Sequence, residues 1–139
     1  MHKFKKLLLL TLFIFVDCNI WLIINLISGK LVVKIFKLRP WMVLNICLDQ
    51  KSKNNFKLAL KKIIAIRTES LNFFSSCLSK SISARIFLDI VRVGNTLNLA
   101  IYKSDDGSKV LHAFLEDSLD GSLFTGNPKT TIKILSTFK

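Results

Sequence analysis

The fold is decided by residues 75–117, which read SSCLSKSISARIFLDIVRVGNTLNLAIYKSDDGSKVLHAFLED. Ser75 and Ser76 have side-chain oxygens that can cap the free N–H groups of a helix beginning at Cys77. The apolar residues that follow share one helical face: Leu78, Ile82, Ile86 and Ile90. Gly94 is a typical helix stop. The pattern therefore predicts a helix from residue 77 to about residue 93, with a cysteine in its first turn.

Beyond Gly94 the apolar period changes from 3.6 residues to 2, because the apolar residues at 97, 99 and 101 alternate with their neighbours. Asp105-Asp106-Gly107 predicts a hairpin turn, and residues 110–116 form the returning strand. A second turn at 117–121, a third strand at 122–125 and a closing segment of open type at 130–138 complete the chain. Helices followed by an antiparallel meander define an α+β fold.

The N-terminal third is apolar and basic. Residues 7–27 are nearly all apolar, which is typical of a membrane span, a signal peptide, or helices buried in the protein or lying on a membrane surface. Asp17 counts against a span, since an ionised carboxylate is costly in hydrocarbon. Residues 31–38 resume as a basic amphipathic stretch that ends at Arg39-Pro40, and residues 42–48 fit a short helix or strand. Residues 49–55 read as a polar loop, and residues 56–67 have helical spacing.

The chain has 139 residues, which fits one domain. We expect a helical region over 1–55 and a core over 56–139, forming one compact unit. The net charge of +12 attracts polyanions such as nucleic acid, anionic lipid or an acidic peptide, or it reflects only a solvated basic surface. No RNA-binding motif accompanies it, so nucleic acid is not an expected partner.

The three cysteines are an odd number without repeated spacing, which argues against a disulfide framework and a structural zinc site and favours a reducing compartment. Cys18 and Cys47 lie in apolar surroundings and are expected to be core or lipid-facing residues. Cys77 differs from them, because a helix N-terminus favours the thiolate, which is the nucleophilic form.

His112 lies in the middle of the predicted returning strand, where the sheet fixes its direction, and it is the natural general base for Cys77. Closing the second hairpin between Asp117 and Ser122 places Asn127 opposite His112, where the amide oxygen could orient the imidazole. Asp120, in the turn itself, is a fallback for that role. The plainer alternative is a small buried thiol and an ordinary strand histidine.

Four segments carry a resemblance to a known family: Cys77-Leu78-Ser79-Lys80-Ser81, Gly94, His112-Ala113-Phe114-Leu115-Glu116 and Gly126-Asn127. Together they resemble the peptidase half of the lasso-peptide B proteins, which are transglutaminase-like, papain-like cysteine peptidases. The family usually has arginine where this chain has Lys80, tryptophan where it has Phe114, and aspartate where it has Asn127.

The resemblance implies a transglutaminase-like core that removes the leader peptide from a ribosomally made lasso-type precursor. It implies Cys77 as nucleophile, His112 as general base and, by position, Asn127 as the orienting residue. Implied partners are the precursor peptide, a separate leader-recognition protein and a macrolactam synthetase. ATP would be used by the maturation complex, with no cofactor or metal bound by this chain. We expect a cytoplasmic location, with an anionic membrane surface as a further candidate partner. The alternatives are an inactive copy of the peptidase and a non-catalytic, basic, membrane-associated protein.

Overall fold

The computed structural model describes residues 3–27, 31, 34, 39–44, 46–71, 76–103, 105–125 and 131–139. The helical elements are α1 (Lys3–Leu26), the 3-10 turn η1 (Pro40–Val43), α3 (Gln50–Glu69) and α4 (Cys77–Ile90). The strands are β1 (Asn95–Lys103), β2 (Lys109–Asp117), β3 (Leu123–Thr125) and β4 (Thr131–Phe138). The predicted α+β class is confirmed, and the closing segment proves to be a strand.

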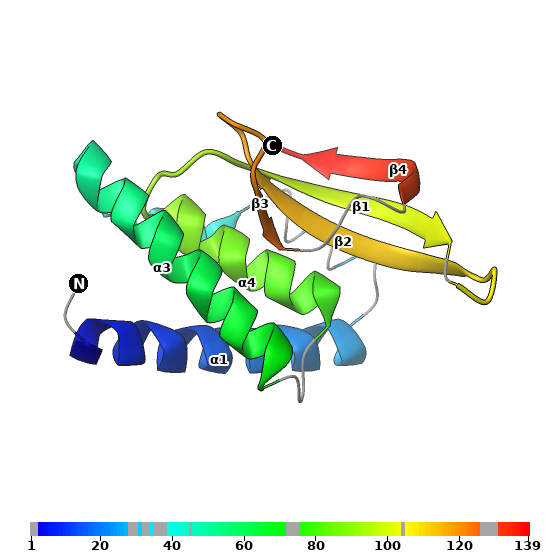
Figure 1. Cartoon of the computed structure of the whole chain (residues 1–139), viewed down its shortest axis with the longest axis horizontal. Coiled ribbons are helices and arrows are strands. Elements are labelled where there is room, and N and C mark those ends of the chain that lie inside the picture. Colours follow the sequence, from blue (N-terminus) through cyan, green and yellow to red (C-terminus); the bar gives the residue numbers. More distant parts are fainter. Residues whose placement is uncertain are drawn as a thin grey trace.

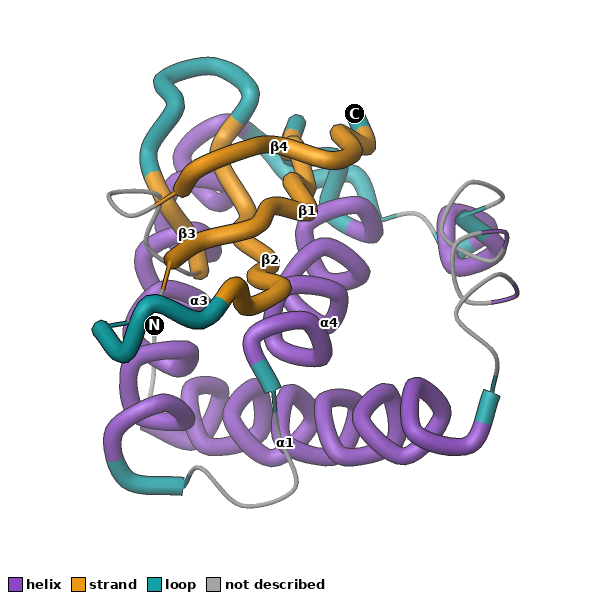
Figure 2. Tube along the Cα trace, turned by 90° about the vertical axis from the view of Figure 1, so that its right-hand side faces the viewer, coloured by secondary structure: helices purple, strands orange, loops and turns teal. Residues whose placement is uncertain are grey.

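The strands form one antiparallel sheet in the order β3-β2-β1-β4. The predicted β1–β2 hairpin pairs Asn95 with Asp117 at one end and Lys103 with Lys109 at the other. At its turn Gly107 has a φ of 85°, a backbone conformation that glycine adopts without strain. Helix α4 lies between the sheet and α1 (Figures 1 and 2), so it contacts both.

The core forms where the helices meet the sheet. Leu97 of β1 and Leu115 of β2 pack with buried residues from all three long helices, namely Phe13, Leu60, Ile63, Ile64, Ile82 and Leu88. Because side chains alternate along a strand, the odd-numbered residues of β2 from 111 to 117 face these helices. The even-numbered residues, including His112, face the other side of the sheet.

Helix α3 begins earlier than the sequence suggested. The segment 49–55, expected to be a polar loop, starts the helix instead, and the Asp49 side chain caps it by accepting a bond from the Ser52 N–H at 3.2 Å. These residues are exposed or half-buried on all sides of the first turns of α3, which is why their composition resembled a loop. The expected boundary between residues 55 and 56 falls inside α3.

The apolar N-terminal segment folds as one long helix. Among the described residues, Lys5–Leu26 is the stretch whose length and hydropathy would suffice to cross a membrane. Phe13 and Asp17 are nevertheless fully buried against the rest of the protein. Most of the predicted basic helix at 31–38 lies outside the described residues. Residues 42–48 begin in η1 and continue without regular structure over 46–48, where Cys47 is exposed rather than in the core.

Candidate functional site

The site predicted around Cys77 begins at a well-defined helix start. Cys77 is the first residue of α4, as expected, and Ser76 is the N-cap. The two serines of a capping box bond reciprocally: the Ser79 N–H donates to Ser76 Oγ at 3.0 Å, and the Ser76 N–H donates to Ser79 Oγ at 2.9 Å. These bonds fix where the helix begins, and they leave the half-buried sulfur of Cys77 at its positive end.

One turn further along α4, Lys80 is almost completely buried, with 9% of its surface exposed. Burial lowers the pKa of Lys80, while the charges of Asp17 and Cys77 act in the opposite direction and Arg67 adds to the lowering. An ammonium group taken out of water is stabilised by negative neighbours, so Asp17 of α1 offsets part of the cost of burying Lys80.

Behind Lys80 lies a fully buried ion pair between two helices. Arg67 of α3 places Nε 2.8 Å from Oδ2 of Asp17 in α1, and neither side chain is exposed. The same guanidinium donates from Nη2 to Cys18 Sγ at 3.4 Å and from Nη1 to the carbonyl of Leu71. Cys18 therefore lies in a polar cluster, contrary to the apolar surroundings expected for it.

Two features of the sequence indicate this ion pair. A lone acid in an otherwise apolar helix needs a cation where that helix is buried, and Arg67 ends the apolar face of the next long helix. Asp17 of α1, Arg67 of α3 and Lys80 of α4 form what we call the buried charge cluster.

His112 lies on β2, paired with Ala100 of β1. Its ring meets Tyr102 edge-on, with centroids 5.3 Å apart, and stacks with Phe114 at 6.5 Å. Burial lowers the pKa of His112 below its ordinary value, so the ring is neutral near pH 7. A neutral imidazole has a lone pair with which to accept a proton, as a general base requires.

The cysteine helix and the histidine strand meet at the edge of β2. Ser81 Oγ donates to the Ala113 carbonyl at 3.4 Å and lies 2.5 Å from Oγ1 of Thr125. In the described part of the chain β3 pairs with β2 only at Leu115 and Glu116, so the edge near His112 carries no partner strand there. The side chain of His112 projects from the face of the sheet opposite the one on which α4 packs. Ser81, one turn after Cys77, thus contacts the strand that bears His112, and the predicted contact between Cys77 and His112 stays a prediction.

The third member of the predicted site, Asn127, lies outside the described residues. The hairpin register on which its position depended holds at Glu116 and Leu123 but shifts by one residue at Leu115 and Thr125. The fallback residue Asp120 lies in the turn between β2 and β3. Its turn follows β2 at Asp117, five residues or about 17 Å along the strand from His112.

Asp120 is instead engaged within its own turn. Its carboxylate accepts the Ser122 N–H at 2.8 Å, and the bonds from Ser122 lower the pKa of Asp120. It is exposed, and it lines a surface hollow with Lys57 and Lys61 of α3. Its interactions are those of a turn that packs beside α3.

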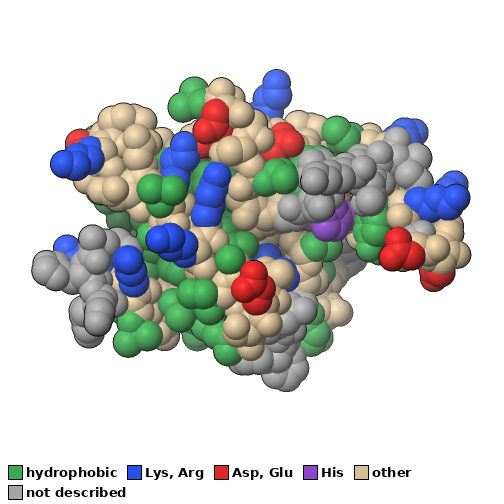
Figure 3. Space-filling view, viewed as in Figure 1, with side chains coloured by type: hydrophobic (Ala, Val, Ile, Leu, Met, Phe, Trp, Pro, Cys, Tyr) green, Lys and Arg blue, Asp and Glu red, His purple; other side chains and the backbone are tan. Residues whose placement is uncertain are grey.

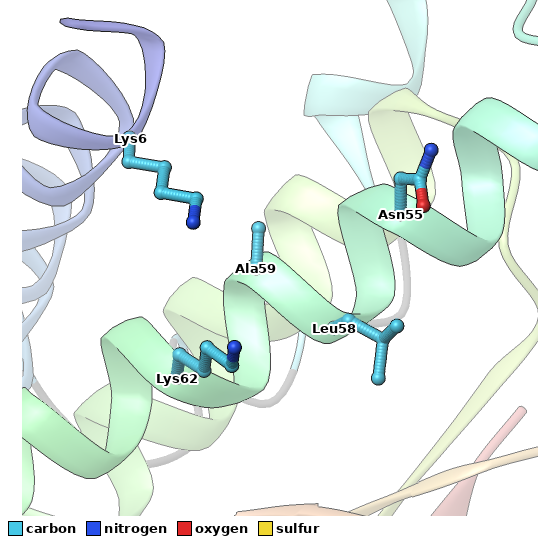
Figure 4. Close-up of a pocket in the computed structure, with 5 residues that line it drawn as sticks. All are labelled: Lys6, Asn55, Leu58, Ala59 and Lys62. Atoms are coloured by element: carbon cyan, nitrogen blue, oxygen red, sulfur yellow. The ribbon is translucent and has the colours of Figure 1, made fainter. Parts of the chain in front are cut away.

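A second surface hollow lies between α1 and α3. Lys6, Asn55, Leu58, Ala59 and Lys62 line it, and Figure 4 shows Lys6 extending from α1 toward α3. An adjoining groove between the same helices adds Leu7, Leu10, Ile63 and Ile66. None of these residues belongs to the predicted peptidase site. Within the described residues, no group of three His, Cys, Asp or Glu side chains is placed to hold a metal ion.

Compared with known protein families, curated proteins and solved structures, the chain matches none.

Proposed function

We propose that this chain is a cysteine peptidase with a transglutaminase-like core, which removes the leader peptide from a ribosomally made lasso-type precursor. The observation that carries the proposal is the succession of elements. A capped helix opens with Cys77 and packs on an antiparallel sheet, and the second strand of that sheet bears His112. The residues around Cys77, Gly94 and His112 resemble those of the lasso-peptide B proteins, and this resemblance supports Cys77 as nucleophile and His112 as general base.

In the proposed reaction the thiolate of Cys77 attacks the carbonyl carbon at the junction of leader and core peptide. A carbon–sulfur bond forms, and the carbonyl oxygen becomes an oxyanion. Ser76 takes up the N–H groups of Ser79 and Lys80, so those of Cys77 and Leu78 stand at the open end of the helix. Backbone N–H groups at a helix N-terminus stabilise such a negative charge.

His112 completes the cycle as the proton carrier. It takes the thiol proton, gives it to the leaving amine as the carbon–nitrogen bond breaks, and then accepts a proton from the water that hydrolyses the thioester. Cleavage releases the acid and restores the thiolate of Cys77. For this the imidazole must reach the sulfur around the edge of β2, the edge that Ser81 already contacts through Ala113. Asn127 is proposed to orient the ring by its position in the sequence.

Two cysteine variants test the assignment with a matched control. Cys77→Ala should abolish release of the leader from a precursor peptide supplied with its recognition protein, as followed by mass spectrometry. Cys47→Ala removes an exposed thiol remote in sequence from the motif and should leave release unchanged. Equal activity of the two variants would sink the proposal.

A second test needs no substrate and uses the folded full-length chain. Cys47 is more exposed than Cys77, so accessibility alone favours alkylation of Cys47 by iodoacetamide. An activated Cys77 should nevertheless be modified first near neutral pH, as read by peptide mapping. Faster labelling of Cys47 would instead favour a non-catalytic protein or an inactive copy of the peptidase.

A further inference from the structure

The outer face of α1 carries an apolar stripe that the rest of the protein does not cover. Its residues recur at intervals of four, three, seven and four: Leu8, Leu12, Phe15, Leu22 and Leu26. Each keeps between 46% and 75% of its surface exposed. Leu7 and Ile23 flank the stripe and are also exposed. An apolar patch of this length on one helix face marks an interaction site.

The polar side chains on this side of α1 each donate a hydrogen bond to the backbone of the same helix. Thr11 Oγ1 donates to the carbonyl of Leu7 at 3.0 Å. The amide of Asn19, which lies within the stripe, donates to Phe15 O at 2.7 Å, and Asn25 donates to Trp21 O at 2.7 Å. Polar side chains that bond to the carbonyl four residues earlier can tolerate apolar surroundings. These bonds reduce the cost of placing the outer face of α1 against lipid.

The inner face of α1 is held to the protein, which keeps the outer stripe pointing outward. Phe13 packs against Phe87 of α4, with ring centroids 5.8 Å apart, and Asp17 pairs with Arg67 of α3. If α1 crossed a bilayer alone, Asp17 would enter hydrocarbon and Arg67 would lose the partner shown in this structure. The packing favours a helix that lies along a surface over one that passes through it.

Positive charge and further apolar area border the stripe. Lys5 and Lys6 are exposed at the start of α1, and Lys62 is exposed on α3 beside it (Figure 4). Leu58 and Ile66 of α3 are exposed too, so the apolar area continues from one helix to the other. Figure 3 shows hydrophobic side chains gathered over α1 and α3 with Lys and Arg side chains among and beside them.

We propose that the face formed by α1 and α3 binds the surface of an anionic lipid bilayer. Helix α1 lies in the plane of the interface, with Leu8, Leu12 and Phe15 among the acyl chains. Lys5, which lies three residues before Leu8 on the same helical face, and Lys62 of α3 contact the negative headgroups, because apolar insertion and headgroup attraction together determine such binding. This proposal stands on its own and does not depend on the peptidase activity.

The test is co-sedimentation of the full-length chain with phosphatidylcholine vesicles, with and without phosphatidylglycerol. We expect binding to the anionic vesicles that weakens as salt is raised. The triple variant Leu8→Ser/Leu12→Ser/Phe15→Ser should lose at least about tenfold in affinity, because it removes three inserted side chains. Its matched control is Leu111→Ser/Leu119→Ser/Ile134→Ser, which replaces three exposed apolar residues of the sheet and its turns and should bind normally.

A charge variant keeps the test independent of any folding defect in the triple variant. Lys5→Gln/Lys62→Gln should weaken binding to anionic vesicles by about fivefold per lysine at low salt. Lys103→Gln/Lys109→Gln, which changes two exposed lysines at the far end of the hairpin, should have no effect.

Four results would overturn the proposal. One is an equal loss in the test and control variants, and a second is equal binding to neutral and anionic vesicles. A third is resistance to alkaline carbonate extraction, which would show that α1 spans the bilayer. The last is a dimer in solution that the Leu8/Leu12/Phe15 variant dissociates, which would show that the stripe binds a second copy of the chain.

Discussion

At the scale of single residues, the ion pair between Asp17 and Arg67 holds α1 against α3. Both side chains are fully buried, and Arg67 also bonds to Cys18 and to the Leu71 carbonyl. Removing one partner leaves the other as an uncompensated buried charge. We therefore expect Asp17→Ala to lower the free energy of unfolding by about 3–5 kcal/mol, as measured by urea denaturation.

A double variant distinguishes loss of charge from loss of packing at this position. Asp17→Leu/Arg67→Met replaces both ions with apolar side chains and should recover much of the stability, because apolar replacements of a buried pair are often neutral. A single-variant cost below about 1 kcal/mol would be that of an exposed pair, and it would contradict the burial of Asp17.

His112 gives a pH dependence whose sign follows from its burial. Its pKa in the folded protein is lowered, so as the pH falls the unfolded chain binds a proton before the folded chain does. Stability should be constant above about pH 6.5 and should decrease below it, until the folded-state pKa is passed. His112→Gln should flatten this decrease in urea midpoints measured between about pH 7.5 and about pH 5.5. Glu116→Gln is the control, because it changes an acid on the same side of β2 as His112. The decrease in stability that His112 causes should remain in this variant. If the urea midpoint of His112→Gln decreases with pH as steeply as that of the original protein, the lowered pKa of His112 is contradicted.

At the scale of elements, the start of α4 is the feature most open to a direct test. Ser76→Ala removes the oxygen that accepts the Ser79 N–H, and it should reduce stability by about 1 kcal/mol. If Cys77 is activated by the helix start, its alkylation should slow as well, because a frayed first turn no longer presents aligned N–H groups. Thr68→Ala, at an exposed position of α3, is the control for a simple loss of a hydroxyl. Thermal melts and peptide mapping give the two readouts, and an unchanged melt for Ser76→Ala would show that the cap contributes little.

How far the sequence predicted each element depends on whether local periodicity or long-range contact determines it. The starts and ends of α4, β1 and β2 could be read closely, since the period changes from 3.6 to 2 at Gly94 and the hairpin turn has its own residues. Strand β4 could not, because it is an edge strand with register irregularities and with Ile134 and Leu135 both exposed in succession. Its apolar pattern therefore has no clean alternation.

The candidate site divides in the same way. Cys77 at a helix start is a local property that Ser76 signals in the sequence. The pairing of Asp17 with Arg67 joins residues fifty positions apart, and no local pattern reports which helices will pack together. The face on which His112 points follows from the register between β1 and β2, and a sequence determines that register only through the whole core.

At the scale of the whole molecule, α1 is an integral layer of the fold. A chain shortened to begin at residue 28 would expose the α4 surface that Phe13 covers and would leave Arg67 without Asp17. We expect this shortened chain to lose cooperative unfolding in a thermal melt followed by circular dichroism. A melt equal to that of the full-length chain would show that α1 is dispensable.

The net charge of +12 lies mostly on the surface, but a small part of it is enclosed. With all three side chains ionised, the buried charge cluster contains two cations, Arg67 and Lys80, and one anion, Asp17. It therefore has one positive charge in excess. A thiolate at Cys77 would make the net charge of this group zero, and forming a thioester at Cys77 would restore the positive charge. In the proposed peptidase, the excess positive charge of this cluster would compensate the thiolate that attacks the substrate. Lys80→Met should accordingly slow alkylation of Cys77 severalfold, whereas Lys80→Arg should preserve it.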